Sequence, residues 1–311
     1  MARHGTCHLR PRCDRRTVAG ATNGRQLREA RRCGEPVSPT APVFGTSRPL
    51  VFAHRGGAAL APENTMAAID NGLAMGADGI EIDVQLSSDG IPVVIHDPTL
   101  DRTTDRVGRV NALSAAELAR VDAGFRFEKD GRHPFRGQGV GIPRLDAVLA
   151  KHRDTRVIIE MKGAEPELGR AVGAVIRNAG AVDRVCVSSF SQQSINTLRA
   201  EFPELMTGAS QEEARWALHR SWVRWPWPRH RVYSAFQVPE FAGRMRVVSR
   251  NFLRHVHREG HVVQVWVVNR REDVQRLLDW GVDGIISDVP DLAMAARDEW
   301  AREGYSYRRR R

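Results

Sequence analysis

Short runs of apolar residues alternate with longer amphipathic segments along the chain from residue 49 onward. A short apolar run bounded by turn residues is typical of a buried strand, whereas apolar residues spaced three and four apart indicate a helix. Strands are predicted at 49–53, 80–86, 156–162, 185–188, 205–209, 233–238, 262–268 and 284–287. Helices are predicted at 66–76, 145–151, 166–178, 191–202, 251–259, 271–280 and 290–302, with a further one spanning at most 212–224.

This alternation of strand and helix predicts a parallel sheet, and eight such units predict a closed (β/α)8 TIM barrel, an α/β fold. The polar, glycine-rich region at about 101–141 does not follow the alternation and contains one short predicted helix at 114–121. Because this region is too long for an ordinary connection, we expect an insertion after the second strand, close to the functional site.

The stretch 79–98, GIEIDVQLSSDGIPVVIHDP, is predicted to form a β-hairpin. Since side chains on a strand alternate between its two faces, Glu81 and Asp83 project from the same face. Two neighbouring carboxylates repel each other unless a cation lies between them or one binds a proton. With His96 at the end of the return strand, the pattern suggests an oxygen-ligated divalent metal and a proton-transfer group. The stretch alone is equally compatible with a solvated hairpin face.

Five titratable side chains fall at the ends of predicted strands: His54, Glu81, Asp83, Glu160 and Lys162. In (β/α)8 barrels, the chemistry lies at the carboxyl ends of the strands. Scattered surface charge does not explain such a convergence, so we expect these side chains to form one site.

The formal charge of +10 lies mostly at the two ends of the chain. The first 50 residues hold ten arginines and three acidic residues, and the last four residues are all arginines, so the remainder has a net charge of −1. A nucleic-acid-binding domain carries its basic surface on the folded part, so we expect no specific nucleic-acid partner. The predicted organisation is a disordered basic tail at 1–47, a barrel domain at 48–303 and a basic tail at 304–311.

The cysteines indicate neither a disulfide framework nor a zinc site, because Cys7, Cys13 and Cys33 lie in the tail and Cys186 stands alone in an apolar run. The first 47 residues contain no apolar core of a signal peptide, and no apolar run reaches the length of a membrane span. We therefore expect a cytoplasmic protein, with association at a membrane surface as the alternative.

Several motifs, taken together and in order, resemble those of the glycerophosphodiester phosphodiesterase family. They are VFAHRGG, APENT, GIEIDVQLSSDGIPVVIHDPTLDRTT, IPRLDAVL, IIEMK, VSSF, VQVWVVN and GVDGIISDVP. The resemblance implies a TIM-type barrel with an insertion after the second strand. It also implies metal-dependent hydrolysis of a phosphodiester such as glycerophosphocholine or glycerophosphoethanolamine, giving sn-glycerol 3-phosphate and an alcohol.

The resemblance also implies roles for individual residues. By motif position, the metal ligands are Glu81, Asp83 and Glu160, the acid–base pair is His54 and His96, the phosphate-binding groups are Arg55 and Lys162, and Glu63 is an acidic site residue.

The implied residue types suit the chemistry of a phosphodiester. A hard divalent cation offsets the phosphate charge, and all-oxygen ligands favour Mg²⁺, Ca²⁺ or Mn²⁺. Histidine titrates near neutral pH and serves as acid or base, although the sequence does not assign the two roles. The alternative for the carboxylates is a salt-bridge cluster with the cations. Phe190 and Trp266 are candidates for lining the substrate pocket, with packing in the barrel core as the alternative, and Asp288 is interpreted as structural.

The segment 215–231, RWALHRSWVRWPWPRHR, combines tryptophans with cations, a composition that favours a membrane interface. We expect a loop over the barrel mouth that contacts lipid, the alternative being a loop packed on the side of the barrel. Two rival functions remain open: a phospholipase D-type hydrolase of lysophospholipids at a membrane, and a catalytically silent module that binds glycerophosphodiesters or lipid. The complete set of histidines, carboxylates and cations favours an enzyme.

Overall fold

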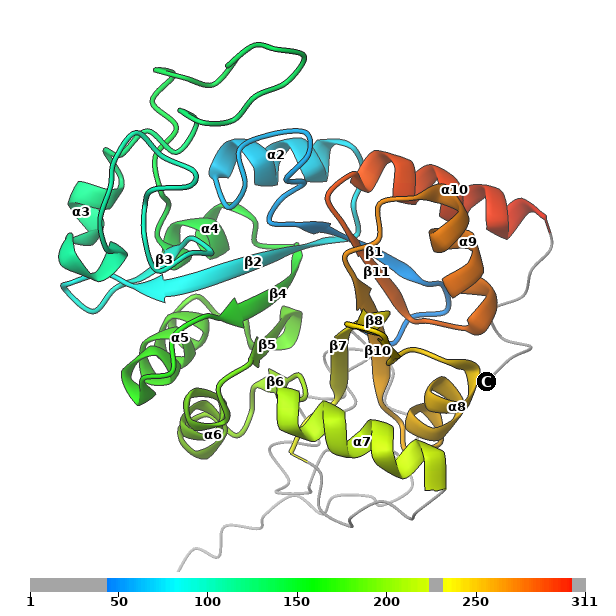
Figure 1. Ribbon diagram of the computed structural model, residues 1–311. Helices are drawn as coiled ribbons and strands as arrows, with labels where there is room; N and C mark the ends of the chain where they lie inside the picture. Colours follow the sequence, from blue (N-terminus) through cyan, green and yellow to red (C-terminus); the bar gives the residue numbers. More distant parts are fainter. Residues whose placement is uncertain (1–43, 224–231, 304–311) are drawn as a thin grey trace, which may run out of the picture.

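The computed structural model describes residues 44–223 and 232–303, in which eight parallel strands are surrounded by helices (Figure 1). The strands of this ring are β1 Leu50–His54, β2 Gly79–Leu86, β4 Arg156–Met161, β5 Val185–Ser189, β6 Met206–Thr207, β7 Ala235–Pro239, β10 Val262–Trp266 and β11 Gly284–Ser287. The surrounding helices are α2 Met66–Ala74, α4 Leu145–Lys151, α5 Pro166–Asn178, α6 Gln192–Glu201, α7 Gln211–Val223, α8 Arg250–Arg258, α9 Arg271–Trp280 and α10 Pro290–Arg302. The shorter elements are β3 Pro92–Val94, β8 Phe241–Ala242, β9 Met245–Arg246, α3 Ala115–Leu118 and the 3₁₀ turns Val110–Ala112 and Val182–Arg184.

The strands follow the order β6-β5-β4-β2-β1-β11-β10-β7, with every neighbouring pair of this path parallel. A parallel bridge between Gly208 and Ala235 joins the two ends of this path and closes the ring. The prediction of a (β/α)8 barrel is therefore confirmed. The fifth predicted strand, 205–209, is a regular strand over only two residues, so it forms few backbone pairings with its neighbours in the barrel.

Alternation along the strands divides the apolar residues between the lumen and the outer shell. Ile80, Ile82 and Val84 of β2 belong to the cluster that packs beneath the helices, which leaves the carboxylates between them facing inward. At the amino-terminal end of the barrel, the lumen is filled by Phe44, whose ring is 1% exposed and stacks on Phe52 at a centroid distance of 5.8 Å. The packed structure therefore includes a residue of the segment that precedes the first strand.

The predicted hairpin is confirmed, because β2 runs past the ring and pairs antiparallel with β3. The chain between β3 and α4 forms the expected insertion. It has a small core, made up of Ile95, Leu100, Val110, Ala115, Leu118, Val121, Ala123 and Ile142, which packs together with Val93 of β3. Helix α3 begins in a capping box between Ser114 and Glu117, and the Ala115 amide donates to the Asp89 carboxylate of the hairpin turn at 3.0 Å. These contacts attach the insertion to the end of the hairpin.

Helix α7 corrects the expectation of a loop over the barrel mouth for residues 215–223. Ser210 and Glu213 exchange hydrogen bonds at the start of the helix. On the inner side of the helix, Ala217 and Leu218 are buried. This apolar side packs against α8, so the helix lies along the outside of the barrel, close to the predicted limit of 212–224. The rest of the tryptophan-rich segment, 224–231, lies outside the described residues.

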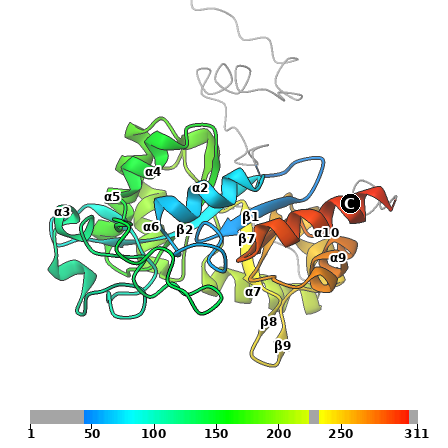
Figure 2. The same ribbon diagram turned by 90° about the horizontal axis from the view of Figure 1, so that it is seen from above.

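The short hairpin β8–β9 was not predicted, and it projects beyond the ring of helices (Figure 2). Its side chains Phe241 and Met245 are exposed. Within the described ranges, no helix combines the length and apolar character needed to cross a bilayer.

Candidate active site

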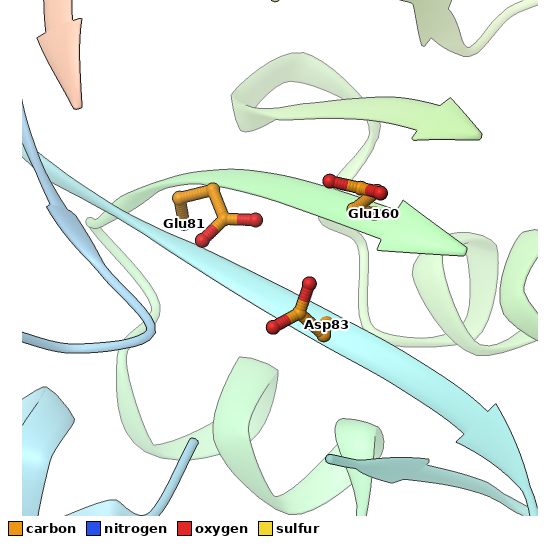
Figure 3. A group of neighbouring side chains, drawn as sticks. All are labelled: Glu81, Asp83 and Glu160. Carbon is orange, nitrogen blue, oxygen red and sulfur yellow. The ribbon is translucent and has the colours of Figure 1, made fainter. Parts of the chain in front are cut away.

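Three carboxylates meet at the carboxyl ends of the neighbouring strands β2 and β4. Glu81 and Asp83 lie on one face of β2, and strand pairing places Asp83 directly opposite Glu160 of β4. One oxygen from each carboxylate lies within 4.8 Å of the others, and Figure 3 shows the three groups converging on one region. Glu81 is only 4% and Asp83 only 1% exposed, so both carboxyl groups are buried.

The electrostatics of this cluster fit a divalent cation. Burial and the neighbouring Asp83 raise the pKa of Glu81 to about 8, which means that the cluster without a cation holds a proton at neutral pH. Burial raises the pKa of Asp83, but Lys162 and Arg55, together with His96 and the hydrogen bond from Asn64, outweigh this effect, so the pKa is lowered. An all-oxygen donor set that binds a proton to relieve its own repulsion suits a hard cation such as Mg²⁺, Ca²⁺ or Mn²⁺.

Two cationic side chains border the carboxylates. The Lys162 ammonium donates to a Glu160 oxygen at 2.7 Å and lies 3.0 Å from Asp83 Oδ1. Arg55 Nε lies 3.2 Å from Asp83 Oδ2, and the Arg55 amide donates to Glu81 at 3.1 Å. The salt-bridge cluster considered for these residues therefore exists, and it leaves N–H groups of both cations available for a bound anion.

Each predicted acid–base histidine is paired with an aspartate through Nδ1. His54 Nδ1 lies 2.6 Å from Asp288, and His96 Nδ1 lies 2.6 Å from Asp97. Because a carboxylate oxygen only accepts hydrogen bonds, Nδ1 carries the proton in each ring and Nε2 is left for chemistry. Burial lowers the pKa of His54, but the hydrogen bond to Asp288 and the charge of Glu81 outweigh it, so this pKa is raised.

Asparagine side chains hold two of these carboxylates in place. The Asn64 amide donates to Asp83 Oδ2 at 2.8 Å and accepts from the Asp83 backbone N–H at 3.1 Å. The Asn269 amide donates to Asp288 at 2.7 Å and accepts from the Asp288 backbone N–H at 2.9 Å. The sequence reasoning missed both asparagines and interpreted Asp288 as structural. The sequence signal for a functional role was the position of these residues in loops that follow barrel strands: Asn64 after β1, Asn269 after β10 and Asp288 after β11.

A cavity of about 150 Å³ lies over the cluster. Its walls include His54, Arg55, Glu81, His96, Glu160, Lys162, Phe190 and Trp266. The rings of Phe190 and Trp266 form an edge-to-face pair 6.3 Å apart, and the Lys162 ammonium lies 5.6 Å from the Phe190 ring centroid. Glu63 does not line this cavity, and its carboxylate accepts hydrogen bonds from the guanidinium groups of Arg55 and Arg102. The structure thus brings the predicted site residues together, with Asp83 and Glu63 supporting the wall.

A TIM barrel with clustered carboxylates, paired histidines and cations at its mouth has the residue types of a barrel hydrolase that acts on phosphate esters, and the carboxylates could hold a metal ion. Residues 54–292 match the model of the glycerophosphoryl diester phosphodiesterase family, and the chain belongs to this family. It is accordingly a phosphodiester hydrolase, and the interpretation as a silent binding module is set aside.

Individual relatives agree with this assignment. A glycerophosphodiester phosphodiesterase of Caldanaerobacter subterraneus subsp. tengcongensis is 34% identical over 78% of this chain and 95% of that protein. The crystal structure of a glycerophosphodiester phosphodiesterase from Agrobacterium tumefaciens is similar with a TM-score of 0.65 and 31% identity, covering 79% of this chain and 99% of the other. A phosphodiesterase of Oleispira antarctica, solved with the product sn-glycerol-3-phosphate, gives a TM-score of 0.66 and 27% identity over 82% of this chain and 99% of the other.

Replacing Asp288 with Asn is expected to lower kcat by about 10- to 100-fold, because the neutral amide has one accepting oxygen for the two donors His54 and Asn269 and no longer fixes the His54 tautomer. The negative charge of Asp288 raises the pKa of His54, so its removal shifts the pH–rate limb governed by His54 to lower pH. A pH profile of kcat for the parent and the variant measures both effects. Parental kcat with an unshifted profile would mean that the pair does not act in catalysis.

Proposed function

We propose that this enzyme hydrolyses glycerophosphodiesters, such as glycerophosphocholine and glycerophosphoethanolamine, to sn-glycerol 3-phosphate and the free alcohol. The observation that carries the proposal is the placement of three carboxylates, two histidine–aspartate pairs and two cations around one small cavity. Such products enter phospholipid and glycerol metabolism.

Glu81, Asp83 and Glu160 are proposed as the ligands of one divalent cation, Mg²⁺ or Ca²⁺ with Mn²⁺ as a further candidate. When bound, the cation supplies positive charge that offsets the phosphate charge and polarises the phosphorus for attack. Arg55 and Lys162 donate to the phosphate oxygens, Arg55 through a planar fork and Lys162 as a point charge. Glu63 orients Arg55 through a hydrogen bond of 2.8 Å.

His54 and His96 divide the proton transfers. One imidazole removes a proton from the nucleophile through its free Nε2, and the other donates a proton to the departing alkoxide. The nucleophile is either a water molecule or the glycerol hydroxyl of the substrate, and in the second case water then opens the resulting cyclic phosphate. Asp288 and Asp97 hold the proton on the opposite ring nitrogens and stabilise each imidazolium as it forms. Phe190 and Trp266 provide apolar contact for the glycerol or alcohol carbon atoms.

The test is a turnover assay of the purified chain with glycerophosphocholine, detecting sn-glycerol 3-phosphate and choline. We expect turnover with added Mg²⁺ or Ca²⁺ and its loss with EDTA. Absence of turnover on both glycerophosphodiesters with every cation tested would refute the proposed substrate.

A second cavity favours a second candidate function, the hydrolysis of lysophospholipids. This cavity, of about 420 Å³, opens beside Glu160, Phe190 and Trp266 and continues between α7 and the β8–β9 hairpin. Most of its far wall is apolar, with Ala209, Ala214, Leu218, Val238, Phe241, Ala242, Met245 and Val247. Its volume lies in the range of ligand pockets, and an acyl chain suits such a wall better than a small polar alcohol does.

Filling this cavity with Ala214→Phe is expected to lower turnover of lysophosphatidylcholine at least tenfold while leaving turnover of glycerophosphocholine near the parental value. Glu212 is exposed on the same helix and does not line the cavity, so Glu212→Phe, which adds the same ring outside the cavity, serves as the control. Equal effects of Ala214→Phe on both substrates would contradict an acyl-binding role.

Contact of the segment 215–231 with a lipid surface is proposed as well, supported by the exposure of Trp216 and Trp222. Point substitutions test it better than a deletion, which would remove the buried side of α7. Vesicle binding that is unchanged by replacing both tryptophans with Ser would reject the contact.

A further inference from the structure

Arg102, near the start of the insertion, bonds to two carboxylates that come from different parts of the barrel mouth. Its two terminal nitrogens donate to the two oxygens of Glu63, each at 2.7 Å, and its Nε donates to Asp97 at 2.5 Å. One guanidinium thus uses three of its five N–H groups on two partners. Glu63 lies in the loop between β1 and α2, whereas Asp97 lies directly after the β2–β3 hairpin.

Each of these carboxylates also holds a residue that lines the cavity. Asp97 binds Nδ1 of His96 at 2.6 Å, and Glu63 accepts from Arg55 at 2.8 Å. A continuous series of hydrogen bonds therefore runs from His96 through Asp97, Arg102 and Glu63 to Arg55. Among the described contacts, Arg102 is the residue that joins the two halves of this series.

We propose that Arg102 is a positioning residue, which fixes the imidazole of His96 and the guanidinium of Arg55 relative to each other. The inference rests on the proposed function of that site. Arginine suits the position because its planar fork binds Glu63 through two bonds while the third donor reaches Asp97. The single ammonium of lysine cannot reproduce this geometry. Without Arg102, Asp97 loses one of its two side-chain partners, so the His96 ring gains rotational freedom.

The competing explanation is an ordinary surface ion pair. The Arg102 side chain is 48% exposed, and exposed pairs contribute little to stability. The two explanations differ in what they predict, because a surface pair changes neither kcat nor stability appreciably. A positioning residue changes kcat strongly and the melting temperature only slightly.

Arg276 provides a matched control. Its terminal nitrogens bind both oxygens of Glu240 at 2.7 and 2.8 Å, and it also donates to Asp273 at 2.6 Å. Arg276 thus also joins two carboxylates through one guanidinium, although its bond to Asp273 comes from a terminal nitrogen and not from Nε. None of its three residues belongs to the wall of the cavity over the carboxylates.

The experiment compares the parent with Arg102→Ala, Arg102→Lys and Arg276→Ala, using glycerophosphocholine and a divalent cation. For Arg102→Ala we expect kcat to fall by about 10- to 100-fold, with KM changed less and the melting temperature close to that of Arg276→Ala. Arg102→Lys is expected to stay at least several-fold below the parent. Guanidinium at millimolar concentration is expected to restore part of the activity of Arg102→Ala and to have no such effect on Arg276→Ala.

Parental kcat in Arg102→Ala, or an equal loss in Arg276→Ala, would overturn the inference. Parental kcat in Arg102→Lys would overturn the requirement for the fork. These outcomes are separable from failure of the proposed function, which is read from the parent enzyme alone. If the parent is active and Arg102→Ala equals it, only the role of Arg102 is rejected.

Discussion

Replacing Glu81 with Gln, Asp83 with Asn or Glu160 with Gln is expected to lower kcat/KM by about 10³-fold or more and to abolish tight binding of Mg²⁺ or Ca²⁺. Each substitution removes one anionic oxygen from a cluster whose ligand atoms lie within 4.8 Å of one another. Metal-ion stabilisation of a phosphoryl transition state supplies several kcal/mol, and about 1.4 kcal/mol corresponds to a factor of ten. Steady-state kinetics and calorimetric titration with Ca²⁺ measure the two effects separately.

The matched control is Asp283→Asn, because Asp283 is also a buried carboxylate at the edge of the barrel but bonds to His257 and the Val263 amide. We expect this variant to bind the cation as the parent does. Parental cation affinity in Asp83→Asn would contradict the assignment of the cluster as the metal site.

The pH dependence of cation binding follows from the same cluster. In the metal-free protein the pKa of Glu81 is raised to about 8 by burial and by Asp83, so the carboxyl is protonated at pH 7. A cation must displace this proton, so its affinity rises as the pH increases towards 8 and binding at pH 7 releases a proton. The folded state binds more protons than the unfolded chain at this group, so the contribution of Glu81 to the stability of the metal-free protein falls as the pH rises from about 4.5 to 8. Titration in weakly buffered solution detects the released proton.

Substitution of either histidine by Ala is the second large effect that we expect. His54→Ala and His96→Ala should each lower kcat by about 10²- to 10⁴-fold, the usual contribution of a positioned acid or base. Cation binding should persist in both variants, because neither imidazole belongs to the carboxylate cluster. Kinetics combined with Ca²⁺ titration therefore separates loss of proton transfer from loss of the metal.

His257→Ala is the control for these two variants, since His257 forms a comparable pair with Asp283 at 2.7 Å outside the site. Its kcat is expected to match that of the parent. A kcat within a few-fold of the parent in both His54→Ala and His96→Ala would exclude the proposed acid–base roles.

Much of the site follows from local patterns in the sequence. Strand periodicity places Glu81 and Asp83 on one face, and the carboxyl ends of parallel strands meet at one edge. His54 and Glu160 join them because β1 and β4 flank β2 in the ring. These positions depend only on strand identity and strand order, which the alternating pattern encodes.

The supporting contacts could not be predicted in this way. Asp288 meets His54 because the last strand pairs with the first, a contact between residues 234 positions apart. Arg102 depends on the path of an insertion that has no repeating pattern. Asn64 lies beside a helix start, where an asparagine is ordinarily read as a cap, while its side chain bonds to Asp83 instead. Such pairings are set by tertiary geometry.

The buried ring of Phe44 determines where a self-sufficient fragment of this chain can begin. A fragment that starts at the first strand would lack the Phe44 ring, which fills the amino-terminal end of the barrel lumen. The Phe52 ring, on which Phe44 stacks, would then be exposed. Truncation of a buried aromatic ring typically costs about 3–5 kcal/mol, which is comparable to the whole margin of a weakly stable domain. The fragment that resists limited proteolysis should therefore include residue 44, which precedes the first strand predicted from the sequence.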